Sequence, residues 1–146
     1  MCVLSTKEDY HIHCNYNDHS SPDLTVSNIV KYAENIDLRV IAFAEHVRKT
    51  SDWIPRHLDE IRRISSNRII EIIVGFEAKI LIDGSIDCPE RYADKYFLIA
   101  SFHTKYHGKQ VWLQALEKAI ENPNVDVIGH IAPEPSFSVE PNEIEQ

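Results

Sequence analysis

Three of the chain's eight histidines lie close together in the stretch EDYHIHCNYNDHSS, residues 8–21. His11 and His13 are two positions apart, and residues with this spacing on a β-strand point to the same face, so both imidazoles can reach one ion. His19 lies beyond the end of such a strand. Neutral imidazole is the commonest side-chain ligand of metal ions. The stretch therefore predicts a metal site at the end of a first strand.

Further imidazoles and carboxylates follow four later apolar segments. Glu45 and His46 end LRVIAFAEH, Glu77 follows IIEIIVGF, His103 follows YFLIAS, and His130 follows VDVIG. Functional residues of parallel βα folds collect at the carboxyl ends of the strands, so we expect these side chains to meet at one rim.

A single histidine at a strand end is more often a hydrogen-bonded structural residue than a metal ligand. The repetition at successive strand ends favours the metal-binding interpretation. Nitrogen and oxygen ligands suit Zn²⁺, Mn²⁺ or Fe²⁺ better than Mg²⁺ or Ca²⁺. Glu77 has two carboxylate oxygens and can bridge two cations, as two-metal sites require.

Strand and helix patterns alternate along the chain and must position these groups. The predicted strands cover 8–14, 38–44, 69–76, 96–101 and 125–129; the predicted helices cover 20–37, a segment starting near Pro55, and 109–122. Ser21 is the expected N-cap of the first helix, with Pro22 at its first helical position. A small hairpin is expected at Asp83-Gly84. Strands separated by helices predict a parallel sheet covered on both faces, in a βα-barrel or a doubly wound α/β fold.

The apolar spacing also predicts which residues form the core. Val26, Ile29, Val30 and Ala33 should face inward from the first helix, and Leu113, Leu116 and Ile120 from the last. We expect Trp112, Tyr106 and Cys14 to be packed structural residues. His57 lies between Arg56 and Leu58 on the polar side of its helix, where we expect a surface residue.

The composition excludes several classes of protein. The 146 residues fit one domain, 1–146, with a net charge of −8, which disfavours a broad nucleic-acid-binding surface. No apolar run is long enough for a membrane span, and no secretion leader is evident. Three cysteines without a CxxC pair suit a reducing compartment, so we expect a cytoplasmic protein.

The motifs DYHIHCNYNDHS, FAEHV, VGFEAKI, LIASFH and VIGHI resemble, in order and spacing, those of the PHP (polymerase and histidinol phosphatase) family of metal-dependent phosphoesterases. The resemblance covers most of the chain. It implies a distorted seven-stranded βα-barrel with up to three metals at its C-terminal rim, of which this chain contains five strands. The family's Asp-x-His near the last strand has no counterpart here, so we expect a C-terminally truncated PHP domain with an incomplete barrel.

Carried over by position, the resemblance implies three metal sites. They are formed by His11, His13 and Glu77; by Glu77, His103 and His130; and by His19 and His46. It also implies hydrolysis of a phosphate monoester, with substrates that range in the family from histidinol phosphate to nucleic-acid ends; the acidic balance and small size of the chain favour a small phosphorylated metabolite, as in histidinol phosphatase. We expect two to three divalent metals, Glu77, His103 and His130 as catalytic residues, and Arg48, Lys105 and His107 as substrate-binding residues.

Other functions remain open at this point. They are a catalytically weak metal-binding scaffold, a phosphoesterase acting on nucleic-acid ends, and a hydrolase of a bond other than a phosphate ester. A five-stranded sheet also leaves two edge strands, which are liabilities unless something covers them, so we expect a homo-oligomer or a poorly soluble chain.

Overall fold

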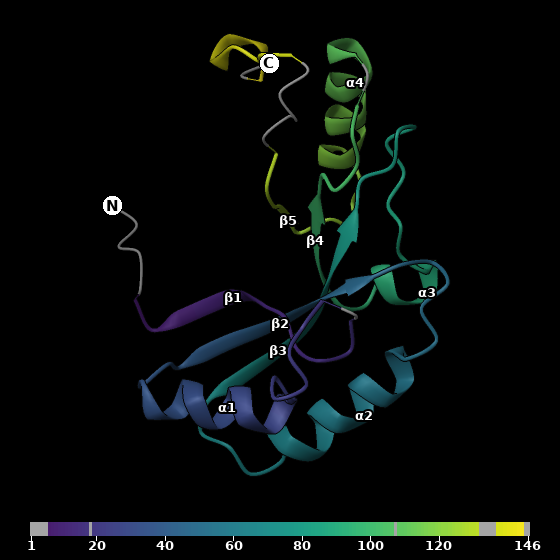
Figure 1. The fold of residues 1–146 in the computed structure, drawn as a ribbon. Coiled ribbons are helices and arrows are strands. Elements are labelled where there is room, and N and C mark those ends of the chain that lie inside the picture. Colours follow the sequence, from purple (N-terminus) through teal and green to yellow (C-terminus); the bar gives the residue numbers. More distant parts are fainter. Residues whose placement is uncertain (1–5, 18, 107, 132–136, 145–146) are drawn as a thin grey trace. The chain divides into compact units, whose positions relative to one another are not determined.

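The computed structural model describes residues 6–17, 19–106, 108–131 and 137–144 and shows an α/β fold (Figure 1). The strands form one sheet in the order β1-β2-β3-β4-β5. They are β1 (Glu8–Ile12), β2 (Val40–Val47), β3 (Glu71–Lys79), β4 (Phe97–Ser101) and β5 (Val127–Ile128). The helices are α1 (Val26–Asn35), α2 (Ile54–Ser65), α3 (Glu90–Ala93), α4 (Lys109–Ile120) and the 3₁₀ helix η1 (Pro141–Glu143).

The predicted α/β class and the five predicted strands are confirmed. β1 pairs with β2 in parallel, and β4 pairs with β5 in parallel, as strands joined by helices should. The short α3 was not predicted. The chain divides into two compact parts, one formed by Met1–His46 with Thr50–Phe76 and the other by Val47–Lys49 with Glu77–Gln146. The expectation of a single domain over 1–146 stays a prediction.

The core of the first part joins α1 and α2 to strands β1 to β3. Figure 1 shows both helices on the same side of these strands. The buried side chains include the predicted stripe of α1, with Ile29 packed against them; they are Cys14, Val26, Val30, Ala33, Ile41, Phe43, Ile61 and Ile70. The apolar periodicity of α1 therefore identified its inner face correctly.

The predicted start of α1 is wrong. The N-cap is Thr25, whose hydroxyl oxygen accepts the N–H of Asn28 at 3.2 Å. Ser21 lies in a preceding turn, where its carbonyl accepts the N–H of Leu24 at 3.0 Å. The carbonyl of Leu24 in turn accepts the N–H of Asn15, which ties this turn to the segment after β1. This tertiary contact holds residues 21–24 outside the helix.

The prediction that His57 lies on the surface is also wrong. α2 begins at Ile54 with Pro55 in its first turn, as expected, but the His57 side chain is 0% exposed. Its ring contacts the rings of Tyr16, Phe43, Trp53 and Phe76. Burial lowers the pKa of His57 to about 4, against attraction from Glu45 and Glu60, so the ring is neutral at neutral pH.

In the second part, the predicted burial of Leu116 on α4 is confirmed, but the buried face of this helix is rotated from the predicted one, and Leu113 is only half-buried. Its buried residues are Trp112, Ala115, Leu116 and Ala119, which share one face of the helix. Ile120, expected to point inward, is 57% exposed because it lies one position beyond this face. Trp112 stacks on Phe102 with ring centroids 5.2 Å apart. The predicted burial of Trp112 and Tyr106 is confirmed.

The predicted hairpin after β3 is present. Ile80 and Ile86 form an antiparallel bridge, and Gly84 between them has a φ of +81°, which glycine adopts without strain. A Cβ at Gly84 would also lie 2.7 Å from Cβ of Lys118. Among the described residues, the helices are all too short or too polar for a membrane span.

Candidate functional site

In the second part, a buried carboxylate lies between two imidazoles. Glu77, on β3, is 1% exposed, and its Oε1 is 3.0 Å from Nε2 of His130 and 3.3 Å from Nε2 of His103. The two rings are edge-to-face, with centroids 4.6 Å apart. A buried carboxylate is costly unless positive charge or hydrogen-bond donors compensate it. The arrangement therefore attracts a cation or a proton.

In the first part, three imidazoles lie together where β1 ends and β2 approaches its end. The rings of His11 and His13 are 5.0 Å apart, and those of His13 and His46 are stacked at 4.3 Å with an interplanar angle of 14°. Imidazole nitrogens are common metal ligands. This set has the chemistry of a transition-metal site.

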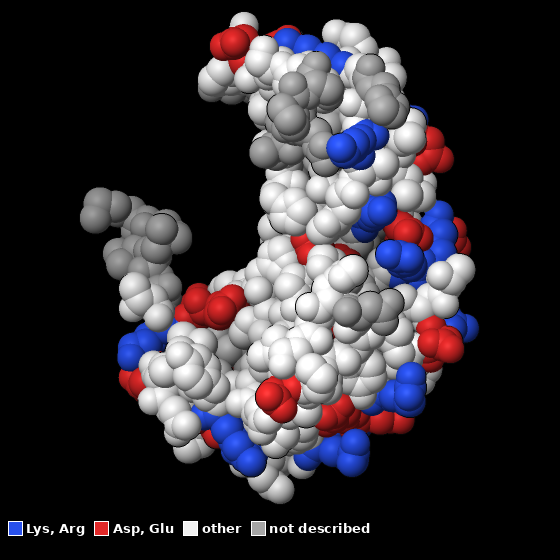
Figure 2. Space-filling view, in the orientation of Figure 1, with Lys and Arg blue, Asp and Glu red and all other residues white. Residues whose placement is uncertain are grey.

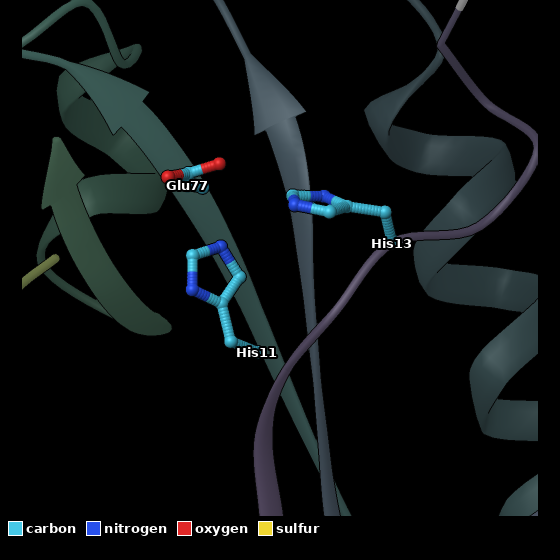
Figure 3. Close-up of side chains that lie close together, drawn as sticks. All are labelled: His11, His13 and Glu77. Atoms are coloured by element: carbon cyan, nitrogen blue, oxygen red, sulfur yellow. The ribbon is translucent and has the colours of Figure 1, made fainter. Parts of the chain in front are cut away.

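Two groups of side chains offer candidate ligand atoms that lie within 4.8 Å of one another. One group is His11, His13 and Glu77, whose side chains lie close together in Figure 3. The other is His46, Glu77 and His103. Zn–N and Zn–O bonds of about 2.0–2.2 Å need donors closer together than this limit. Because the donors are nitrogen and carboxylate oxygen, the residues fit Zn²⁺, Mn²⁺ or Fe²⁺.

The candidate groups include several of the predicted ligands. Glu77 belongs to both groups, as a bridging carboxylate would. His46, which was expected to share a metal ion with His19, has its ring stacked on that of His13 within the first part. His19 is exposed, and its backbone N–H donates to Oδ1 of Asn17 at 2.8 Å. Neither His19 nor His130 belongs to these two groups. The assignment of metal ligands and catalytic residues stays a prediction.

The structure describes two of the three predicted substrate-binding residues. Arg48, which follows β2, and Lys105, which follows β4, are exposed. The backbone N–H of Lys49, the residue after Arg48, donates to Oδ1 of Asp87 at 2.9 Å. This hydrogen bond links the segment after β2 to the segment after β3. His107 lies outside the described residues.

Sequence reasoning missed Asn17, and it placed Glu45 at the rim where functional residues are expected. Glu45 is 0% exposed and accepts hydrogen bonds from the backbone of Cys14 and His46 and from the side-chain amide of Asn17. The position of Glu45 next to His46 at a strand end was the available signal. For Asn17 the sequence offers only its place in a turn-forming stretch.

No protein-family model matches the chain. A protein named probable phosphatase from Clostridium acetobutylicum is 29% identical to it over 133 residues, which is 84% of this chain and 52% of that protein. A second probable phosphatase, from Caldanaerobacter subterraneus subsp. tengcongensis, is 39% identical over 83 residues, or 53% of this chain and 31% of that protein. The matched region thus spans about half of the first relative and a third of the second.

Proposed function

We propose that this chain is part of a metal-dependent phosphatase of the PHP type, which hydrolyses a phosphate monoester. The observation that carries the proposal is the buried Glu77 carboxylate, whose Oε1 lies 3.0 Å from Nε2 of His130 and 3.3 Å from Nε2 of His103. The similarity to two proteins named probable phosphatases supports the reaction class.

In this proposal, His11, His13, His46 and His103 hold two or more divalent cations together with Glu77. Such cations supply positive charge to the phosphoryl oxygens and make water a competent nucleophile at neutral pH. The exposed Arg48 and Lys105 contact the remaining phosphate oxygens as charged hydrogen-bond donors.

His130 has a separate role in the proposal. It lies outside both metal groups, its side chain is 53% exposed, and its Nε2 contacts Oε1 of Glu77. We propose that His130 donates the proton that the leaving alkoxide requires.

The charge distribution favours a small phosphorylated metabolite over nucleic acid as substrate. The net charge is −8. On the face shown in Figure 2, Lys and Arg side chains are interspersed with Asp and Glu side chains. On α2, for example, Arg62 pairs with Asp59 at 3.0 Å. A continuous basic track is the usual electrostatic footprint of a nucleic-acid-binding protein.

The test is a phosphatase assay on protein loaded with Mn²⁺ or Zn²⁺ and freed of excess metal. We expect hydrolysis of p-nitrophenyl phosphate and its loss in Glu77→Gln. Glu117→Gln, at an exposed position of α4, is the control and should keep full activity. His130→Ala should lower kcat while metal content is retained.

Two outcomes would contradict the proposal. Metal-loaded protein that hydrolyses none of a panel of phosphate esters would favour the scaffold interpretation. Hydrolysis of carboxylic esters, lactones or amides, with phosphate esters untouched, would identify a hydrolase of another class.

A further inference from the structure

We propose that Glu45 is a positioning residue, which fixes the main chain and the imidazole rings of His13 and His46 so that both can act as metal ligands. The inference deepens the proposed function and rests on it where metal binding is concerned. The geometry that carries it lies within the first compact part of the chain.

The Glu45 carboxylate connects the main chain next to one histidine with that of the other. Oε2 accepts the N–H of Cys14, the residue directly after His13, at 2.8 Å. Oε1 accepts the N–H of His46 at 2.9 Å and also the side-chain amide of Asn17. Hydrogen bonds to a charged acceptor are stronger than neutral ones, and this acceptor is fully buried. A single side chain therefore holds the backbone at both ligand positions.

The same carboxylate faces the His13 ring. Oε1 of Glu45 is 3.9 Å from Nδ1 of His13, which is longer than a hydrogen bond but close enough for electrostatic attraction. The negative charge favours the tautomer with a proton on Nδ1, which leaves the lone pair of Nε2 available to a metal. The ring of His13 is stacked on that of His46 with centroids 4.3 Å apart, so a fixed His13 ring also restricts the orientation of the His46 ring.

The charge of Glu45, and not only its volume, matters in this arrangement. Glutamine has nearly the same shape but a single acceptor oxygen. The NH₂ group of the glutamine would face one of the N–H groups that now donate to Glu45. The substitution would also remove the negative charge near His13. A purely structural role predicts lower stability in Glu45→Gln with an unchanged His13 tautomer.

The experiment compares wild type, Glu45→Gln and a matched control, Glu60→Gln. Glu60 is another carboxylate bonded to the segment after β1, since its Oε2 accepts the Tyr16 hydroxyl at 2.6 Å. Two measurements are made on metal-free protein: the His13 tautomer from imidazole ¹⁵N–¹H spectra, and the affinity for Mn²⁺ and Zn²⁺ from calorimetric titration.

We expect Glu45→Gln to weaken metal binding about 10–100-fold, as loss of an outer-shell partner does, and to shift His13 away from the Nδ1–H tautomer. Glu60→Gln should change neither. If Glu45→Gln does not fold, Asn17→Ala is used instead: it removes one donor to Oε1, leaves the negative charge of that oxygen less compensated, and should therefore shift His13 further towards the Nδ1–H tautomer.

An unchanged tautomer and affinity in folded Glu45→Gln would overturn the proposal, as would an unchanged His13 signal in Asn17→Ala where that variant has to be used. If wild type binds no metal, the proposed function fails. The tautomer measurement then still decides whether Glu45 orients His13.

Discussion

Glu77 is the residue on which the two candidate metal groups converge, since its carboxylate belongs to both. His11 belongs to one of them. We therefore expect Glu77→Ala to lose both bound ions and His11→Ala to lose one. Metal content after loading, measured by inductively coupled plasma mass spectrometry, checks this. Equal losses in the two variants would show that Glu77 does not bridge.

His57 should make the stability of the protein depend on pH. Its pKa is lowered from 6.5 to about 4 by burial, so below pH 6.5 the unfolded chain binds a proton that the folded chain does not. The contribution of the neutral His57 to the free energy of unfolding is thus fully present above pH 6.5, and it is lost as the pH falls towards 4. The loss approaches about 3 kcal/mol from this group, at 1.36 kcal/mol per pKa unit.

The measurement is urea unfolding of wild type and His57→Leu at pH 7.5 and pH 5. Leucine cannot take up a proton, so the difference in stability between the two proteins should change in favour of the variant as the pH falls. An identical pH dependence in both would contradict the burial of a neutral His57.

At the scale of elements, the start of α1 depends on Thr25. Its hydroxyl caps the N–H of Asn28, so Thr25→Ala should lower the free energy of unfolding by about 1 kcal/mol. Ser21→Ala is the control, because its hydroxyl accepts only a 3.5 Å contact from the N–H of Asp23. Urea unfolding at neutral pH measures both. A larger effect at Ser21 would place the helix start where the sequence pattern had indicated.

The elements also determine which groups can meet at the candidate site. β3 carries Glu77, and His103 and His130 follow β4 and β5, so the sheet order β3-β4-β5 brings these three side chains together. β1 and β2 are neighbours in the same way, which accounts for the stacking of His13 on His46. Strand pairing therefore assembles each set from residues far apart in the sequence.

At the scale of the whole molecule, metal binding should contribute to stability. Ions bound only by the folded chain stabilise it by about 2.7 kcal/mol per site at a free concentration 100 times Kd. Each divalent ion also offsets two of the eight net negative charges. Calorimetric unfolding should show a lower Tm after treatment with EDTA and recovery with Mn²⁺. A Tm unaffected by EDTA and by added metal would argue against bound metal in the native state.

Self-association is a second property of the whole molecule, and it stays a prediction. β1 is an outer strand of the sheet, is exposed over most of its length, and carries Glu8 and Asp9. Acidic side chains oppose pairing between edges, and salt screens them. Sedimentation at about 50 mM and 500 mM salt should show more oligomer at the higher concentration. A monomer at both would mean that the edge is protected.

The sequence alone was sufficient for the order of the five strands and of the long helices α1, α2 and α4, and for the residues at the strand ends. Apolar runs and helical periodicity are local properties, and the buried stripe of α1 follows from them directly. The rule that strand ends carry function pointed to His11, His13, His46, Glu77, His103 and His130 before any contact was known.

Only the tertiary structure decided which of these residues meet and which surfaces are buried. His57 is buried because aromatic side chains from the segment after β1, from β2, from β3 and from the start of α2 surround it. The ring of His46 stacks on that of His13, whereas His19 is exposed. A pattern along the chain records the type and spacing of residues. The contacts between distant segments depend on strand pairing and packing, which that pattern does not contain.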